Sequence, residues 1–200
     1  MTEKINAPIT LDKGGCAWVP KKSQIKAVLR WHGRDNQKAG DLDFYCFYVT
    51  KKNECGKIYY NNMGGKDVSP YIHLLGDSKE PGEEIIIIER PEKLKYILFS
   101  AYSAAENGLG SFYSYNAMVI ISNADGYKVI APLLEKNEKS YWVAMASLDF
   151  IAKRGAVEVK QVERYSKENS ERSPILKPDG TIEMDAGDIE FKGLDLNVKK

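Results

Sequence analysis

The sequence predicts an all-β protein, an antiparallel two-sheet β-sandwich with at most short helical turns and a C-terminal extension. Most apolar runs are short, rich in β-branched or aromatic residues, and separated by Gly, Asn, Asp or Pro, which is typical of strands joined by turns. Amphipathic windows of helix length are scarce. Parallel strands would need crossover helices, so the strands are expected to pair antiparallel in two packed sheets.

The individual strands follow from hydrophobic periodicity. In "IKAVLRW", residues 25–31, apolar side chains alternate with Lys26 and Arg30, which indicates a half-buried strand. The run "EEIIIIE" lacks polar alternation and suits a strand covered on both faces better than an edge strand. Only "RPEKLK" resembles a helix, for about one turn. Further strands are expected at 44–49, 57–60, 71–75, 84–88, 97–102, 117–122, 128–134, 141–150 and 156–162.

The composition changes after Tyr165, and residues 1–165 are therefore expected to form the sandwich domain. The stretch "SKENSERS" has nothing apolar to bury, which predicts a mobile linker or a long exposed loop. Beyond it, "PILKPDGTIEMD" places a Pro-Asp-Gly turn between two apolar segments, a hairpin signal. Residues 166–200 are expected to be a charged linker followed by a hairpin that adds an edge strand or by a loose tail.

Charge and cysteine content exclude several classes of protein. The chain has 200 residues with 29 basic and 28 acidic side chains, so no overall field attracts nucleic acid or an anionic membrane. Cys16, Cys46 and Cys55 are odd in number and form no CxxC pair, which argues against a disulfide framework and a structural zinc site. No apolar run approaches the roughly 20 residues of a membrane-spanning helix. We expect a soluble cytoplasmic protein without direct membrane insertion.

A group of acidic and amide residues indicates a candidate cation site. Asp41 and Asp43 open the second long strand, where alternation sends both side chains to one side, about 7 Å apart. Such a pair matches part of the oxygen shell of Ca²⁺, although the EF-hand template is absent. A sandwich that brought several loops to one end would complete the shell; otherwise these are solvated acids and turn-forming amides. The further candidate ligands are Asn61, Asn62, Asp77, Glu83 and Glu84.

The order of short motifs resembles a known family. The segments "GDLDFYCFYV", "IYYNNMGGKDVSPYIHLLGD", "GEEIII", "LKYILFSAY" and "FYSYNAMVII" resemble, in this order, the TerD domain of tellurium-resistance and stress-response proteins, and the form of the motifs is most similar to the TerA-like branch. The similarity spans roughly residues 9–165. It implies a β-sandwich, calcium bound at one end, no enzymatic turnover, and a role in tellurite resistance and general stress response together with other Ter-type proteins.

The resemblance also assigns a ligand set, with two departures from the family pattern. It places the calcium ligands at Asp41, Asp43, Asn61, Asn62, Asp77, Glu83 and Glu84. The segment "SKEPGEE" is shorter than the family's and adds the positive charge of Lys79, and Ser103 and Ala104 replace a His-Asp pair. Because fewer anionic ligands weaken calcium binding, we expect one site rather than two, weak or lost.

Two other function classes stay open. The first is a metal-free protein interaction domain that docks other Ter-type proteins through a sheet face or through the tail at residues 166–200. The second is a hydrolase, which only a deep pocket with convergent polar groups would support. Cys16 with His32 or His73 does not make a convincing nucleophile and base, because cysteine is commonly a buried small hydrophobe and no HExxH run is present. We therefore expect no enzyme activity.

Overall fold

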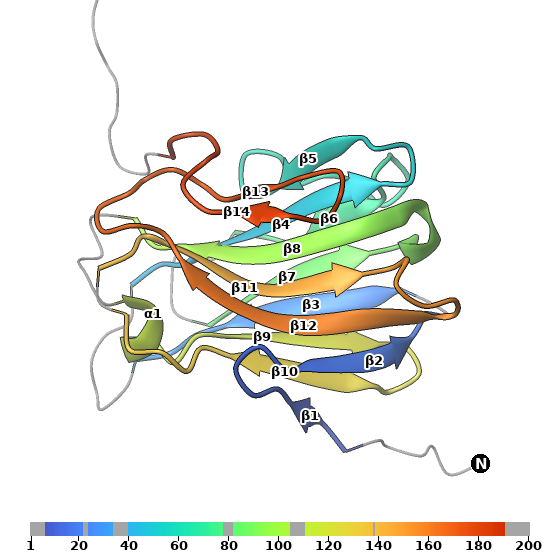
Figure 1. Ribbon diagram of the computed structural model, residues 1–200, viewed down its shortest axis with the longest axis horizontal. Coiled ribbons are helices and arrows are strands. Elements are labelled where there is room, and N and C mark those ends of the chain that lie inside the picture. The colour runs from blue at the N-terminus through green and yellow to red at the C-terminus, as the bar shows by residue number, and fades with distance from the viewer. Residues whose placement is uncertain are drawn as a thin grey trace, which may run out of the picture.

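The computed structural model describes residues 7–21, 24–33, 40–77, 82–104, 111–137 and 139–190, which form two six-stranded sheets packed face to face (Figure 1). All pairings within them are antiparallel except β1 with β10. The predicted all-β sandwich is confirmed. In spatial order, the first sheet contains β1 (Ile9–Thr10), β10 (Lys128–Pro132), β9 (Met118–Asn123), β3 (Ile25–Arg30), β7 (Glu83–Ile88) and β6 (Ile72–Leu74). The second sheet contains, in the same sense, β2 (Cys16–Pro20), β12 (Ala156–Tyr165), β11 (Trp142–Asp149), β8 (Leu94–Tyr102), β4 (Asp43–Thr50) and β5 (Cys55–Ile58).

The main core lies between the two sheets and follows the alternation of the strands. Ile25, Ala27 and Leu29 of β3 point inward from the first sheet. From the second sheet Phe44 of β4 stacks on Phe99 of β8, with ring centroids 5.5 Å apart. Because successive side chains of a strand point to opposite faces, the inward face of each sheet is mostly apolar.

Strand β7 and the helical turn that follows it match their sequence patterns. The unbroken apolar run of β7 lies inside the sheet between β3 and β6, and Ile87 is buried although it points away from the other sheet. The one-turn helix η1 spans Pro91–Lys93, as the segment "RPEKLK" predicts. A second single turn, α1, spans Ser111–Ser114. In the part of the chain that the structure describes, no helix has the length and apolarity needed to cross a membrane.

Residues 166–190 of the expected mobile linker and tail form a defined segment in the structure, and residues 191–200 lie outside the described ranges. We call residues 166–190 the C-terminal strap, which crosses the outer face of the second sheet over β4 and β8 (Figure 1). It contains the hairpin of β13 (Ile175–Leu176) and β14 (Ile182–Glu183), joined through a turn at Gly180. Gly180 has φ +87°, and a Cβ atom there would lie 2.9 Å from the ring of Tyr96. The hairpin is therefore neither an added edge nor loose; it lies on a sheet face.

Beneath the C-terminal strap lies a second, aromatic cluster. The side chains of Tyr45, Tyr102 and Trp142 pack together, with the Trp142 ring centroid 4.7 Å from that of Tyr45 and 4.8 Å from that of Tyr102. Phe47 and Leu176 complete the contact between the sheet and the strap. Apolar residues on both faces of β4 require a cover on each side, and the strap provides the outer one.

Polar contacts attach the C-terminal strap at its two ends. The ammonium group of Lys57 on β5 lies 3.0 Å from Asp188 Oδ2 and 2.5 Å from Glu190 Oε1. The hydroxyl of Tyr102 donates to Glu171 Oε2 at 2.7 Å, and Trp142 Nε1 donates to the Glu171 backbone oxygen at 3.2 Å. Burial raises the pKa of Glu171, while the hydrogen bond from Tyr102 opposes this shift.

We expect Leu176→Ala to lower the free energy of unfolding by about 2–3 kcal/mol, because it removes a buried side chain between strap and sheet. Urea unfolding followed by tryptophan fluorescence measures this loss. Leu134→Ala is the matched control, since the Leu134 side chain is exposed and should cost less than about 0.5 kcal/mol. Equal, small effects of both substitutions would mean that the strap is not part of the cooperatively folded unit.

Candidate functional site

Two of the predicted calcium ligands meet at one end of the sandwich. Asp43 begins β4 in the second sheet and Glu84 lies on β7 in the first, and each is only 2% exposed. Glu84 Oε2 accepts a hydrogen bond from the backbone N–H of Phe44 at 2.7 Å. Half-buried Asp41 lies two residues before Asp43, the first residue of β4. Distant acidic segments therefore converge at these residues, as predicted. The hydrogen bond that the Glu84 carboxylate accepts joins the two sheets.

The acids near the β6 to β7 connection surround a small cavity. Asp77, Glu83 and Glu84 line a volume of about 180 Å³ together with Leu75, Gly76 and Ile85. The Glu83 carboxylate is bonded to Arg30, whose Nε lies 2.6 Å from Glu83 Oε1 on the neighbouring strand. This cross-strand ion pair offsets part of the negative charge that a cation would need.

The two asparagines form a turn. The backbone of Tyr59 and Asn62 exchanges hydrogen bonds of 2.9 and 3.0 Å, and Asn62 Nδ2 donates to the Lys57 backbone oxygen at 2.9 Å. Asn61 and Asn62 are exposed, and no hydrogen bond between described residues joins them to the acidic group. The geometry agrees with the turn-forming role that the sequence left open for them.

The donor set does not fit a complete calcium shell. Ca²⁺ takes six to eight oxygen ligands at about 2.3–2.6 Å. Within the described ranges, no three His, Cys, Asp or Glu side chains are placed so that they could hold a metal ion together. Glu84 is held by the Phe44 N–H group and Glu83 by Arg30, so calcium binding would require both to give up or share their partners.

Cys16 and Cys46 differ in burial, and His32 and His73 each have a partner other than a thiol. Cys16 is exposed on edge strand β2, which corrects the expectation of a buried small hydrophobe. Cys46 is the buried thiol, and burial raises its pKa. His32 lies 3.1 Å from the Asn116 side chain and His73 lies 3.0 Å from Glu89 Oε1, so both histidines have hydrogen-bonded roles.

A buried carboxylate that the sequence did not reveal links the two sheets near β10 and β12. Glu163 is 4% exposed and has φ +43°, next to a register shift between β11 and β12. Its oxygens accept hydrogen bonds from the backbone N–H groups of Leu134 and Glu135, from Tyr165 Oη at 3.2 Å and from Gln161 Nε2 at 2.8 Å. The sequence contains one signal for this role: the alternation of β12 continues into "QVERY", where polar residues take alternate positions.

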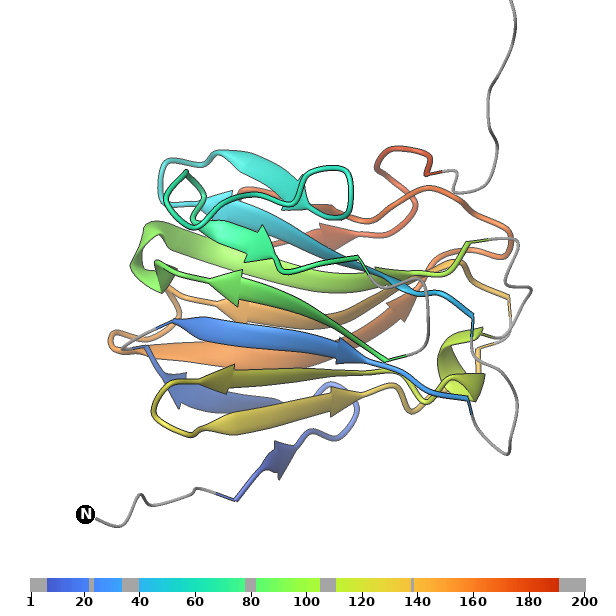
Figure 2. The same cartoon turned by 180° about the vertical axis from the view of Figure 1, so that it is seen from behind.

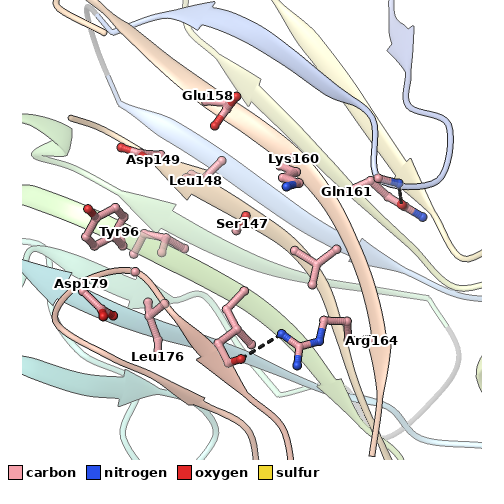
Figure 3. Close-up of a pocket in the computed structure, with 15 residues that line it drawn as sticks. Tyr96, Ser147, Leu148, Asp149, Glu158, Lys160, Gln161, Arg164, Leu176 and Asp179 are labelled. Atoms are coloured by element: carbon pink, nitrogen blue, oxygen red, sulfur yellow. Dashed lines mark hydrogen bonds between the residues drawn. The ribbon is translucent and has the colours of Figure 1, made fainter. Parts of the chain in front are cut away.

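A larger cavity, which we call the charged cavity, lies beside the hairpin on the outer face of the second sheet (Figure 3). It has a volume of about 390 Å³. Strands β8, β11 and β12 form its floor, and the β13–β14 hairpin forms one wall. Both signs of charge line it: Asp149, Glu158 and Asp179 are acidic, and Lys160 and Arg164 are basic.

The strand register places like charges opposite each other in this cavity. Asp149 on β11 is the direct cross-strand partner of Glu158 on β12, and Ser147 is the partner of Lys160. Directly opposed like charges destabilise a sheet by several tenths of a kcal/mol. Among the described residues, no ion pair within 4.0 Å involves any of the five charged groups of the cavity.

Comparison with known proteins identifies the fold. No family model and no curated protein matches the chain. The similar solved structures include that of protein SAV2460, of unknown function, with TM-score 0.52 and 11% identity over 73% of this chain and 91% of that one. They also include that of SCO6318 from Streptomyces coelicolor A3(2), a homologue of telluride resistance protein (TerD), with TM-score 0.50 and 15% identity over 72% of this chain and 89% of that one. The sandwich has a TerD-like fold. At these identities the likeness concerns the fold alone.

The first prediction for this region concerns the buried carboxylate of the TerD-like sandwich. Glu163→Gln should lower the free energy of unfolding by about 1–3 kcal/mol, because an amide nitrogen would face donors that now bond to a carboxylate. Urea denaturation measures the change. The control Glu168→Gln alters an exposed pair with Lys139 and should change stability by less than about 0.5 kcal/mol. An effect of Glu163→Gln as small as the control's would contradict the linking role.

The second prediction concerns the charged cavity. Glu158→Gln should raise the free energy of unfolding by about 0.2–1 kcal/mol, because it removes the repulsion with Asp149 directly across the strands. The gain should shrink at 1 M salt, where the Debye length falls to about 3 Å. Lys160→Gln, two residues further along the same strand, should bring no gain. A loss of stability in Glu158→Gln would show that this carboxylate is favourably solvated or paired.

Proposed function

We propose that this protein is a non-enzymatic binding and scaffold module associated with tellurite resistance and general stress response, and that it works without a bound metal. The TerD-like fold and the ordered family motifs, closest to the TerA-like branch, support the association. The observation that carries the metal-free part is the use of Glu84 as an acceptor for the Phe44 N–H group between the sheets. A carboxylate in that role stabilises the sandwich directly.

The partners that we propose are other Ter-type proteins, docked through a sheet face. The C-terminal strap occupies the outer face of the second sheet over β4 and β8, whereas Figure 2 shows the first sheet with no described segment across it. A row of aliphatic side chains crosses this outer face, with direct pairing from strand to strand. Its outer members, Ile130 and Ile85, are partly exposed, and its central members, Ile120 and Val28, are 5% and 7% exposed. Such a row suits contact with an apolar partner surface.

Calcium binding is the second candidate function. The cavity of about 180 Å³ lined by Asp77, Glu83 and Glu84 favours it, because these three acids come from segments that the family pattern names. Calcium would have to compete with Arg30 for Glu83, so binding would be weak. The two candidates differ in whether calcium stabilises the folded protein.

Melting the full chain in calcium and in chelator tests this difference. A ligand at 100 times its Kd stabilises the folded state by about 2.7 kcal/mol, which shifts the melting temperature measurably. We expect the same melting temperature in millimolar calcium and in EDTA. A calcium-dependent rise that Asp77→Asn abolishes, and that Asp125→Asn in an exposed turn retains, would replace the metal-free proposal with the calcium site.

Tellurite survival tests the biological part of the proposal. In cells that lack this protein, we expect the wild-type chain and Asp77→Asn to restore tolerance equally. Ile130→Lys places a charge at a partly exposed position of the aliphatic row of the first sheet and should fail to restore it while the purified variant stays folded by circular dichroism. Full tolerance with Ile130→Lys would reject docking through this face, and no tolerance with the wild-type chain would reject the association itself.

A further inference from the structure

The charged cavity separates its acidic and basic groups. Figure 3 shows Glu158, Asp149, Tyr96 and Asp179 along one side, and Arg164 on the other, with Lys160 and Ser147 between them. The arrangement follows from the register, because Tyr96, Asp149 and Glu158 are consecutive cross-strand partners on β8, β11 and β12. Lys160 follows Glu158 by two residues and therefore shares its face of the strand.

The acidic side is fixed in position by backbone groups. Asp149 Oδ1 accepts hydrogen bonds of 2.8 Å from the N–H groups of Ile151 and Ala152, and Asp179 Oδ1 accepts one of 2.9 Å from Thr181. Burial raises the pKa of Tyr96, and the charges of Asp149 and Asp179 raise it further, which places the phenol near both carboxylates. Two carboxylates near one phenol, together with Glu158 directly across the strands from Asp149, favour a cationic group.

The basic side is also constrained. Arg164 Nη1 donates to the Ile182 backbone oxygen at 2.8 Å, so the guanidinium is held against the hairpin. Its other donors have no ion-pair partner among the described residues, and the same holds for the Lys160 ammonium group. Lys160 and Arg164 lie on the same face of β12 and both line the cavity, which favours an anionic group such as a carboxylate on this side.

The geometry points to a binding site for a small zwitterion, a molecule with an ammonium group at one end and a carboxylate at the other. We propose that its ammonium group lies between the cross-strand partners Asp149 and Glu158, and that its carboxylate bonds to Lys160, with Arg164 further along the same face of β12. Two residues of a strand span about 7 Å, so a ligand of the size of an amino acid or a dipeptide bridges Glu158 and Lys160 with a hydrogen bond at each end.

Size and energetics agree with this ligand class. A volume of about 390 Å³ lies within the usual range of small-molecule sites, about 300–1,000 Å³. The repulsion between Asp149 and Glu158 is a cost that the empty protein carries and that a bound ammonium group would relieve. Neither a simple cation nor a simple anion would satisfy both sides. This site is independent of the docking face and of calcium, so its test leaves the proposed function unaffected.

The test is an NMR titration of the full chain with zwitterions of increasing charge separation. The probes are glycine, β-alanine, γ-aminobutyrate and diglycine, with ethylamine and propionate as carriers of one charge each. We expect at least one zwitterion to cause saturable amide shifts in Ser147, Leu148 and the strand around Glu158 and Lys160. The singly charged probes should bind at least about tenfold more weakly, equivalent to about 1.4 kcal/mol.

Two variants and a matched control assign the shifts to the charged cavity. Glu158→Gln and Lys160→Gln should each weaken binding of the best zwitterion about tenfold, while Lys26→Gln on the outer face of the first sheet should leave it unchanged. Melting curves of each variant verify that it is folded. Absence of saturable shifts with every zwitterion, or equal binding of propionate or ethylamine, would overturn the proposal, as would retained affinity in both cavity variants.

Discussion

A polar group buried between two packed sheets must be hydrogen-bonded, and this constraint decides what several acidic residues of this chain do. An unpaired buried carboxylate costs several kcal/mol, so it either finds donors or stays at the surface. Glu84 finds the Phe44 N–H group across the sandwich, and Glu163 finds two backbone N–H groups, a phenol and an amide. Glu84, a predicted calcium ligand, and Glu163, which the sequence did not single out, thus both join the sheets in the folded protein.

The sequence predicted those parts of the fold that depend on local patterns. Alternation in β3 and the apolar run of β7 identified strands and their place in the sheet, because side-chain direction repeats every two residues. The end of the sandwich at which Asp43 and Glu84 meet was also predictable, since both residues begin strands. The unbroken apolar run of β4 indicated that its outer face needed a cover, but not which segment would supply it.

Partners across strands were beyond sequence reasoning. Arg30 neutralises Glu83 only because β3 and β7 pair in one particular register, and a slip of one residue would separate them. The opposition of Asp149 to Glu158 depends on register in the same way. The C-terminal strap was hidden by its polar composition, because few apolar side chains, Leu176 among them, account for its contact with the sheet. Long-range pairing, rather than residue type, therefore determines which charges are available to a ligand.

The order in which the chain is synthesised gives the C-terminal strap a further role. Tyr45, Tyr102 and Trp142 leave the ribosome before residues 166–190, and at 5–20 residues per second those 25 residues take roughly one to five seconds to make. During that interval the growing polypeptide presents an uncovered aromatic surface of the kind that chaperones bind. The outer face of the second sheet thus stays uncovered until residues 166–190 are translated, and a chain that ended before them would keep its aromatic surface exposed to other proteins.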